Sequence, residues 1–140
     1  MDQHLTCELA DNAEYLFVYG TLRKAFQLEV ANVLQTHAEY VGLGRIAGRL
    51  YDVGSYPGVT LSDDSSDVVV GEIYKLIEPK IVYAQLDAYE GISTPPHAAD
   101  EYVKQNVSLL DEADYIVSVY VYQHATSSLK RVVSGDYLHR

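Results

Sequence analysis

The sequence contains very little cysteine: Cys7 is the single one among 140 residues. One cysteine cannot build an intramolecular disulfide, and we therefore expect a reduced, cytoplasmic setting. Long hydrophobic runs are also missing, because no stretch is apolar for long enough to span a bilayer. Residues 1–14 carry polar and acidic side chains, which is unlike a signal peptide. We expect no membrane partner.

Positive charge is scarce as well. Lys and Arg number 10 against 20 Asp and Glu, which gives a formal net charge of −10. Such an acidic chain is poorly suited to bind a nucleic-acid backbone or an anionic membrane surface. A small basic pocket can still exist on an acidic surface, so the net charge does not restrict the small molecules that could bind.

Several kinds of catalytic motif are absent. The sequence has no serine in a glycine-flanked elbow and no glycine-rich phosphate loop with lysine. The 5 histidines are scattered without metal-ligand spacing, so we expect neither a metal nor a cofactor. Cys7 lies in the polar N-terminal segment and is a poor nucleophile candidate. What remains for chemistry is carboxylates, backbone dipoles and the hydroxyls of 13 tyrosines.

The length suits one domain, which we place at residues 15–140 after a loose lead-in over residues 1–14. Apolar and β-branched runs predict about six strands, and two segments predict short helices. The expected fold class is therefore α+β, a small mixed β-barrel with short flanking helices. The expected helices are 28–37 and 79–89, and the final segment, 130–140, reads as a short basic tail.

The helix expected at 79–89 begins at Pro79 and ends before Gly91, two residues typical of those positions. Its predicted buried stripe consists of Val82, Leu86 and Tyr89, while Asp87 points further toward water.

Glu90 is the candidate catalytic carboxylate. It follows the last turn of that helix, where the macrodipole is negative, and it lies beside the apolar stripe. Both effects disfavour the charged form, so we expect a raised pKa and a better proton acceptor near neutral pH. The alternative is a frayed surface residue at a helix end.

A second candidate is the turn that follows the apolar strand at residues 16–18. Tyr19, Gly20, Thr21 and Leu22 end this strand abruptly, and such a turn leaves backbone N–H groups pointing outward. These groups could bind a carboxylate or stabilise an oxyanion. An ordinary strand and turn is the alternative. Arg23 follows at once and either attracts an anionic ligand or is a solvated surface charge.

Two tyrosines of the strand expected at 115–123 are candidate pocket residues. Tyr120 and Tyr122 share a face with other polar side chains, and the opposite face is aliphatic. The aliphatic face predicts core, while the tyrosines line a cavity or face water. The core-facing residues are Val117, Val119 and Val121.

Three motifs resemble the γ-glutamylcyclotransferase-like family, in particular its small members. They are Phe17-Val18-Tyr19-Gly20-Thr21-Leu22-Arg23, Leu86-Asp87-Ala88-Tyr89-Glu90-Gly91 and Tyr102-Val103-Lys104. Secondary matches are Tyr56-Pro57-Gly58, Val70-Gly71-Glu72-Ile73-Tyr74 and Ser134-Gly135-Asp136-Tyr137, so that the resemblance spans residues 17–137.

The resemblance implies a mixed barrel, substrate binding through the backbone of Tyr19 to Leu22, and Glu90 as general acid/base. It implies that a γ-glutamyl amine or γ-glutamyl amino acid is converted to 5-oxoproline and a free amine without a metal. Lys104 is a possible pocket residue at which many relatives carry arginine. Two other hypotheses use the same fold: a non-catalytic module that binds a small metabolite, and an unrelated enzyme of small amines or amides.

Overall fold

The computed structural model describes residues 13–140. Most of the expected lead-in, together with Cys7, lies outside the described residues. The first strand, β1, spans Glu14–Val18 and so includes one residue of the segment that we expected to precede the domain.

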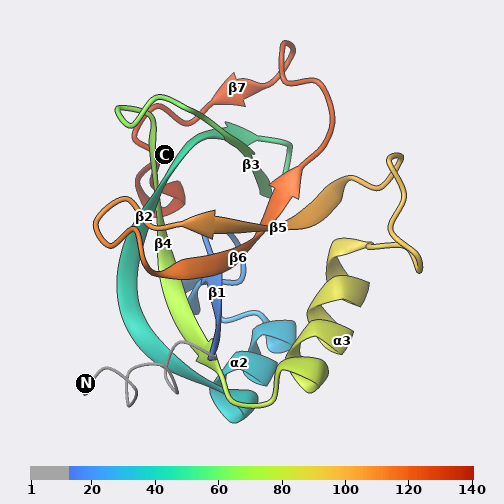
Figure 1. Cartoon of the computed structure of the whole chain (residues 1–140). Helices are drawn as coiled ribbons and strands as arrows, with labels where there is room; N and C mark the ends of the chain where they lie inside the picture. Colours follow the sequence, from blue (N-terminus) through green and yellow to red (C-terminus); the bar gives the residue numbers. More distant parts are fainter. Residues whose placement is uncertain (1–12) are drawn as a thin grey trace.

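Five strands close a mixed barrel (Figure 1). The order around the barrel is β1, β4, β2, β3, β6 and back to β1. The pairings of β6 with β3 and with β1 are parallel, and the other three are antiparallel. The strands are β2 (Ala38–Asp52), β3 (Pro57–Leu61), β4 (Val68–Leu76) and β6 (Ile116–Tyr122). The expected α+β barrel is confirmed.

Two further strands extend this barrel. β5 (Tyr102–Ser108) pairs with β6 outside the ring, and the two-residue β7 (Lys130–Arg131) pairs with β2. The described sheet thus has seven strands rather than about six. The extra strand lies in the segment that we expected to be a basic tail.

The tail prediction was wrong, because the end of the chain packs onto the barrel. Tyr137 is only 2% exposed and belongs to the barrel core. The backbone oxygen of Gly135 accepts a hydrogen bond of 2.8 Å from the Val70 N–H on β4. The sequence did not predict this packing, because the buried side chains of this segment follow neither the period of a strand nor that of a helix. The basic residues between them made the segment look solvent-exposed.

The core has two layers, and β1 lies between them. Phe17 points into the barrel, where it packs with the aliphatic face of β6 as predicted. Leu16 and Val18 point outward and are covered by the helices, with Leu34 and Leu86. A strand buried on both faces does not alternate in polarity, which explains the continuous apolar run at its position in the sequence.

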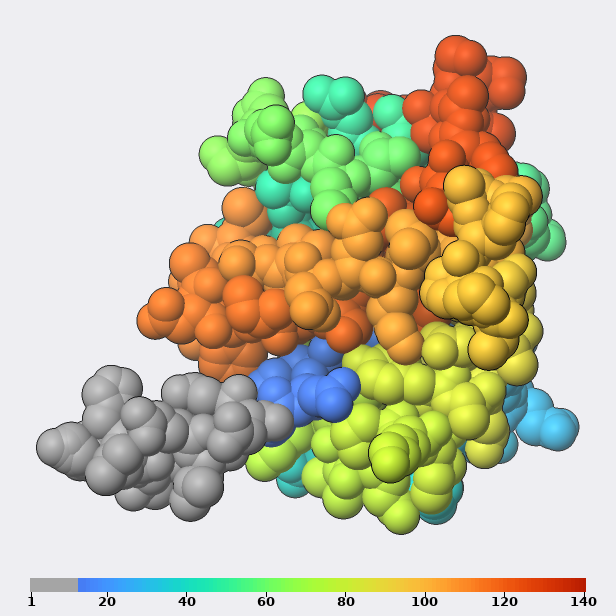
Figure 2. Space-filling view, turned by 45° about the vertical axis from the view of Figure 1, so that its right-hand side comes forward, coloured from blue at the N-terminus to red at the C-terminus, as the bar shows by residue number. Residues whose placement is uncertain are grey.

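The helices cover the outer face of β1. α2 (Asn32–His37) follows a 3₁₀ turn, and α3 (Pro79–Glu90) ends at Gly91, whose φ of 74° is the left-handed cap. Figure 2 shows α3 below the hairpin of β5 and β6, with the loop 92–100 beside both. No helix within residues 13–140 is long and apolar enough to cross a membrane.

The stripe predicted on α3 is only partly right. Val82 and Leu86 are fully buried, but Tyr89 is 47% exposed. Tyr89 lies in the last turn of the helix, past the contact with β1, and its ring borders a cavity instead of the core.

We expected Arg23 either to attract an anionic ligand or to be a solvated surface charge, and both expectations were wrong. Its side chain is buried, with 3% exposure, and forms two ion pairs. Its Nε lies 3.2 Å from Oε2 of Glu72 on β4, and a terminal nitrogen lies 2.8 Å from Oδ1 of Asp136 near the C-terminus. Glu72 also accepts a hydrogen bond of 3.0 Å from the Lys24 N–H. The buried guanidinium therefore joins the turn after β1 to β4 and to the end of the chain.

We expect Arg23→Ala to lower the free energy of unfolding by about 3–5 kcal/mol, because it leaves the Glu72 carboxylate buried without a cation. Arg45→Ala is the matched control. It removes an arginine–carboxylate pair with Asp111 that is about half exposed, and we expect a loss of about 0–1 kcal/mol. Urea unfolding measures both, and equal losses would show that the buried network does not hold the fold.

Candidate functional site

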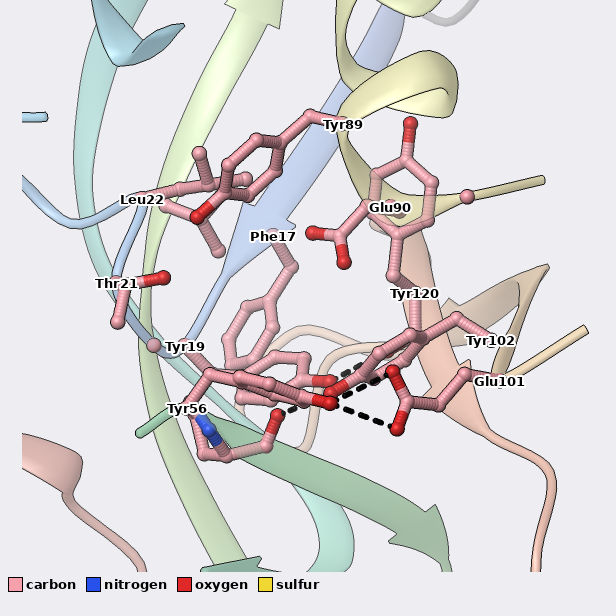
Figure 3. Close-up of a pocket in the computed structure, with 14 residues that line it drawn as sticks. Phe17, Tyr19, Thr21, Leu22, Tyr56, Tyr89, Glu90, Glu101, Tyr102 and Tyr120 are labelled. Carbon is pink, nitrogen blue, oxygen red and sulfur yellow. Dashed lines mark hydrogen bonds between the residues drawn. The ribbon is translucent and has the colours of Figure 1, made fainter. Parts of the chain in front are cut away.

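A cavity of about 430 Å³ opens where β1 ends (Figure 3). Five segments far apart in the sequence form its walls: the end of β1 with the turn after it, the β2–β3 loop, the C-terminal end of α3, the start of β5, and β6. The volume lies within the range of small-molecule sites. The lining residues are Phe17, Val18, Tyr19, Gly20, Thr21, Leu22, Tyr56, Pro57, Tyr89, Glu90, Gly91, Glu101, Tyr102 and Tyr120.

The turn after β1 presents unpaired backbone donors. The Arg23 N–H donates to the Gly20 oxygen at 3.0 Å, which closes the turn. Within the described part of the chain, the N–H groups of Gly20, Thr21 and Leu22 have no recorded acceptor. In Figure 3 the Thr21 hydroxyl of the same turn points into the cavity. This wall therefore offers donors to a negatively charged group.

Glycine is required at position 20 because the backbone there lies very close to the side chain of Pro57. A Cβ there would lie 2.4 Å from Cγ of Pro57, much closer than two carbon atoms can approach. The turn after β1 is thus packed directly against the first residue of β3, which fixes the spacing between two walls of the cavity.

Glu90 lies across the cavity from Thr21 (Figure 3). It is the last residue of α3, and the left-handed Gly91 that follows turns the chain away. Among residues 13–140 no hydrogen bond to the Glu90 carboxylate is recorded. Burial raises its pKa to about 7, and the charges of Glu101 and Asp87 act in the same direction. At neutral pH this carboxyl group is therefore poised between its two protonation states.

Tyrosine hydroxyls fix the floor of the cavity. The Tyr19 hydroxyl donates to the backbone oxygen of Tyr120 at 2.6 Å and accepts from the Val59 N–H at 3.3 Å. The Tyr102 hydroxyl donates to the backbone oxygen of Pro57 at 2.6 Å. Burial raises the pKa of both Tyr19 and Tyr102, so these hydroxyls stay neutral. They tie the walls together.

Glu101 and Tyr56 form a second polar group in the cavity. The Tyr56 hydroxyl donates to both oxygens of the Glu101 carboxylate, at 2.9 and 2.8 Å, and this hydrogen bond raises the pKa of Tyr56 to about 12. Sequence reasoning missed both residues. Tyr56 lies in one of the matched motifs, which was a usable signal, whereas an acid just before a strand has no distinguishing pattern.

The structure places six of the nine predicted site residues around the cavity: Tyr19, Gly20, Thr21, Leu22, Glu90 and Tyr120.

The other three, Arg23, Lys104 and Tyr122, do not line it. Lys104 Nζ lies 3.2 Å from both carboxylate oxygens of Asp87. Tyr122 packs edge-on against Tyr102, with ring centroids 5.7 Å apart.

Asp87 does not point to water as expected. It accepts a hydrogen bond of 2.6 Å from the Tyr120 hydroxyl in addition to its pairing with Lys104. The hydroxyl of Tyr120 is therefore directed away from the cavity, and its ring forms part of the wall.

The charges of the cavity are arranged on two sides. Glu90 and Glu101 project from one side, and Thr21 of the turn with the unpaired N–H groups lies on the other (Figure 3). Among residues 13–140, no Lys, Arg or His lines the cavity. In residues 13–140 no group of three His, Cys, Asp or Glu is placed to hold a metal ion. The arrangement suits a ligand with an anionic end and a cationic end.

Solved structures of the γ-glutamylcyclotransferase-like class share this fold. The solution structure of Escherichia coli YtfP has a TM-score of 0.61 and 29% identity, over 89% of this chain and 96% of that one. The crystal structure of a mouse AIG2-like protein has a TM-score of 0.61 and 20% identity, over 81% of this chain and 80% of that one.

Sequence comparison gives the same class. The family described as "Gamma-glutamyl cyclotransferase, AIG2-like" matches residues 16–139, and the chain belongs to this family. The Gamma-glutamylcyclotransferase family protein YtfP of Escherichia coli K12 is 31% identical over 126 residues, which cover 89% of this chain and 96% of that protein. The family expected from the motifs is confirmed.

Glu90→Gln should make the protein more stable at high pH. The carboxyl group binds its proton more tightly in the folded than in the unfolded chain, so wild-type stability falls as pH rises through about 7. From pH 5 to pH 8 the variant should gain about 1–3 kcal/mol of unfolding free energy relative to wild type. Chemical denaturation at the two pH values measures this gain.

Glu112→Gln serves as the control, because Glu112 is exposed at the turn between β5 and β6. It should change the unfolding free energy by less than about 0.5 kcal/mol at both pH values. If Glu90→Gln followed wild type in parallel from pH 5 to pH 8, the carboxyl group would have an ordinary pKa.

Proposed function

We propose that this chain is a cyclotransferase that converts a γ-glutamyl amine or γ-glutamyl amino acid to 5-oxoproline and a free amine. The observation that carries the proposal is Glu90, a carboxylate that lies across a small cavity from Thr21. In the part of the chain that the structure describes, neither this carboxylate nor the N–H groups of residues 20–22 have a recorded partner. Membership of the γ-glutamylcyclotransferase-like family supports it.

The proposed substrate contains its own nucleophile. The α-amino nitrogen attacks the γ-carbonyl carbon, a C–N bond closes the five-membered ring, and the C–N bond to the leaving amine breaks. All atoms are accounted for without water, an oxidant or a protein nucleophile. The protein has to hold the folded conformer in which nitrogen and carbonyl meet, and such proximity is a large source of rate.

Glu90 handles the proton in this proposal. The α-ammonium must lose a proton before it can attack, and the departing nitrogen must gain one. A carboxylate with a pKa of about 7 can accept the first proton and deliver it to the leaving group. Burial makes the Glu90 carboxylate a stronger base, because burial disfavours its ionised form and so favours proton uptake.

The turn meets the negative charge of the substrate. The substrate brings an α-carboxylate, and an oxyanion develops during attack. Because the tyrosine hydroxyls of the floor donate elsewhere, the donors without a recorded acceptor among residues 13–140 are the N–H groups of Gly20, Thr21 and Leu22 and the hydroxyls of Thr21 and Tyr89. Fixed dipoles of this kind are effective where water is excluded.

The test is release of 5-oxoproline by purified protein from γ-glutamyl amines, γ-glutamyl amino acids and glutathione. Glu90→Gln should reduce kcat by about 10²-fold to 10⁴-fold, because it removes proton transfer and keeps the shape of the side chain. The control Glu112→Gln should turn over like wild type. Wild-type activity in Glu90→Gln would refute the role of Glu90, and saturable binding without product would indicate a binding module.

The pH dependence provides a second test. The free enzyme needs ionised Glu90 to accept a proton, so kcat/KM should fall about tenfold for each pH unit below an apparent pKa near 7. An acid limb centred near 4 would show that a carboxyl group in an ordinary environment controls the reaction.

A further inference from the structure

We propose that Glu101, oriented by Tyr56, binds a positive charge on the leaving amine, so that the preferred substrates are γ-glutamyl derivatives of diamines or polyamines. This inference rests on the proposed function and specifies its substrate class. The cavity contains a second carboxylate, Glu101, for which the cyclotransferase chemistry has no use.

The α-ammonium of a γ-glutamyl group accounts for one carboxylate only. Glu90 has to meet that ammonium, since it takes its proton. Glu101 then remains on the same side of the cavity, and no cation among residues 13–140 is recorded as its partner. The hydroxyl of Tyr56 supplies a hydrogen bond to Glu101 but does not neutralise its charge. A cationic ligand group would neutralise it.

The Glu101 carboxylate is held ready for such a contact. Tyr56 donates one proton shared by both oxygens, which fixes the plane of the carboxylate and leaves lone pairs on each oxygen for N–H donors. The next residue, Tyr102, is anchored through its hydroxyl to the Pro57 oxygen, so the backbone at the start of β5 is fixed as well. A pre-positioned carboxylate loses little conformational entropy when a ligand binds.

The negative charges of Glu90 and Glu101 disfavour the binding of substrates with an anionic leaving group. A leaving amino acid brings a carboxylate close to Glu101 and Glu90, and like charges in a partly desolvated cavity repel each other. A neutral alkylamine is neither attracted nor repelled. We therefore expect the order cationic, neutral, anionic among leaving groups of one length.

Three synthetic amides of one chain length isolate the terminal charge: the γ-glutamyl amides of 1,4-diaminobutane, pentylamine and 5-aminopentanoic acid. Wild type should favour the diamine amide over the pentylamine amide by about tenfold or more in kcat/KM, and the anionic amide should be the poorest. In Glu101→Gln the ratio should fall to near one. Glu112→Gln, which removes the same charge at a remote exposed site, should keep the wild-type ratio.

A purely structural role for Glu101 predicts a different result. If the carboxylate serves only to hold Tyr56, then Glu101→Gln and Tyr56→Phe lower kcat/KM for all three amides by one factor, and the ratios stay at wild-type values. That outcome would overturn the inference. Loss of the charge preference in 0.5 M salt, about three times physiological ionic strength, would support a charge-based contact.

Binding separates this inference from the proposed function. Calorimetry on Glu90→Gln gives dissociation constants for the same three amides without turnover, and they should show the same order of charge. Product from all three amides at equal kcat/KM overturns the inference and keeps the cyclotransferase. Charge-ordered binding without product in wild type overturns the cyclotransferase and keeps the recognition of a cation by Glu101. Neither product nor charge-ordered binding overturns both.

Discussion

A buried guanidinium holds the turn on which the candidate site depends. Arg23 is the residue directly after the turn, and its two ion pairs fix it to β4 and to the C-terminal segment. An arginine in this position sets the backbone just before it, at residues 20–22, whose N–H groups have no recorded acceptor within residues 13–140. A buried ion pair contributes little net stability but is costly to break on one side, so it restrains geometry strongly. The turn therefore presents its donors from a rigid frame.

The other walls are restrained by different means. Gly20 allows the turn to touch Pro57, and the hydroxyls of Tyr19 and Tyr102 hydrogen-bond to backbone groups of neighbouring segments. The hydroxyls of Tyr19 and Tyr102 thus donate their protons to backbone groups of the protein itself. Among the described residues, the Glu90 carboxylate has no recorded partner, and Glu101 has a hydroxyl partner but no recorded cation. The contrast divides the cavity into groups that maintain its shape and groups that remain available to a ligand.

The sequence was sufficient for the parts of the structure that are encoded locally. The apolar run of β1, the proline and glycine that bound α3, and the aliphatic face of β6 each follow from spacing and residue type. Arg23 could not be placed this way, because its partners are 49 and 113 residues distant in the chain. The predictions for Tyr89 and Asp87 were wrong for a related reason. A helical period gives the direction of a side chain but not which other segments of the chain lie in that direction. Glu101 could be recognised as a cavity residue only from the tertiary structure, which places the start of β5 at the cavity together with the turn after β1.

Stability and the proposed chemistry compete at Glu90. Holding a carboxyl group with a pKa of about 7 at the edge of the core disfavours its ionised form, so the folded protein is less stable above neutral pH than it would be with an amide there. Glu101 increases this cost, since its charge raises the pKa of Glu90 further. In the proposed function, a ligand that carries positive charge would compensate the two acids that destabilise each other around this cavity. A γ-glutamyl group supplies one such charge, and a diamine leaving group would supply the second.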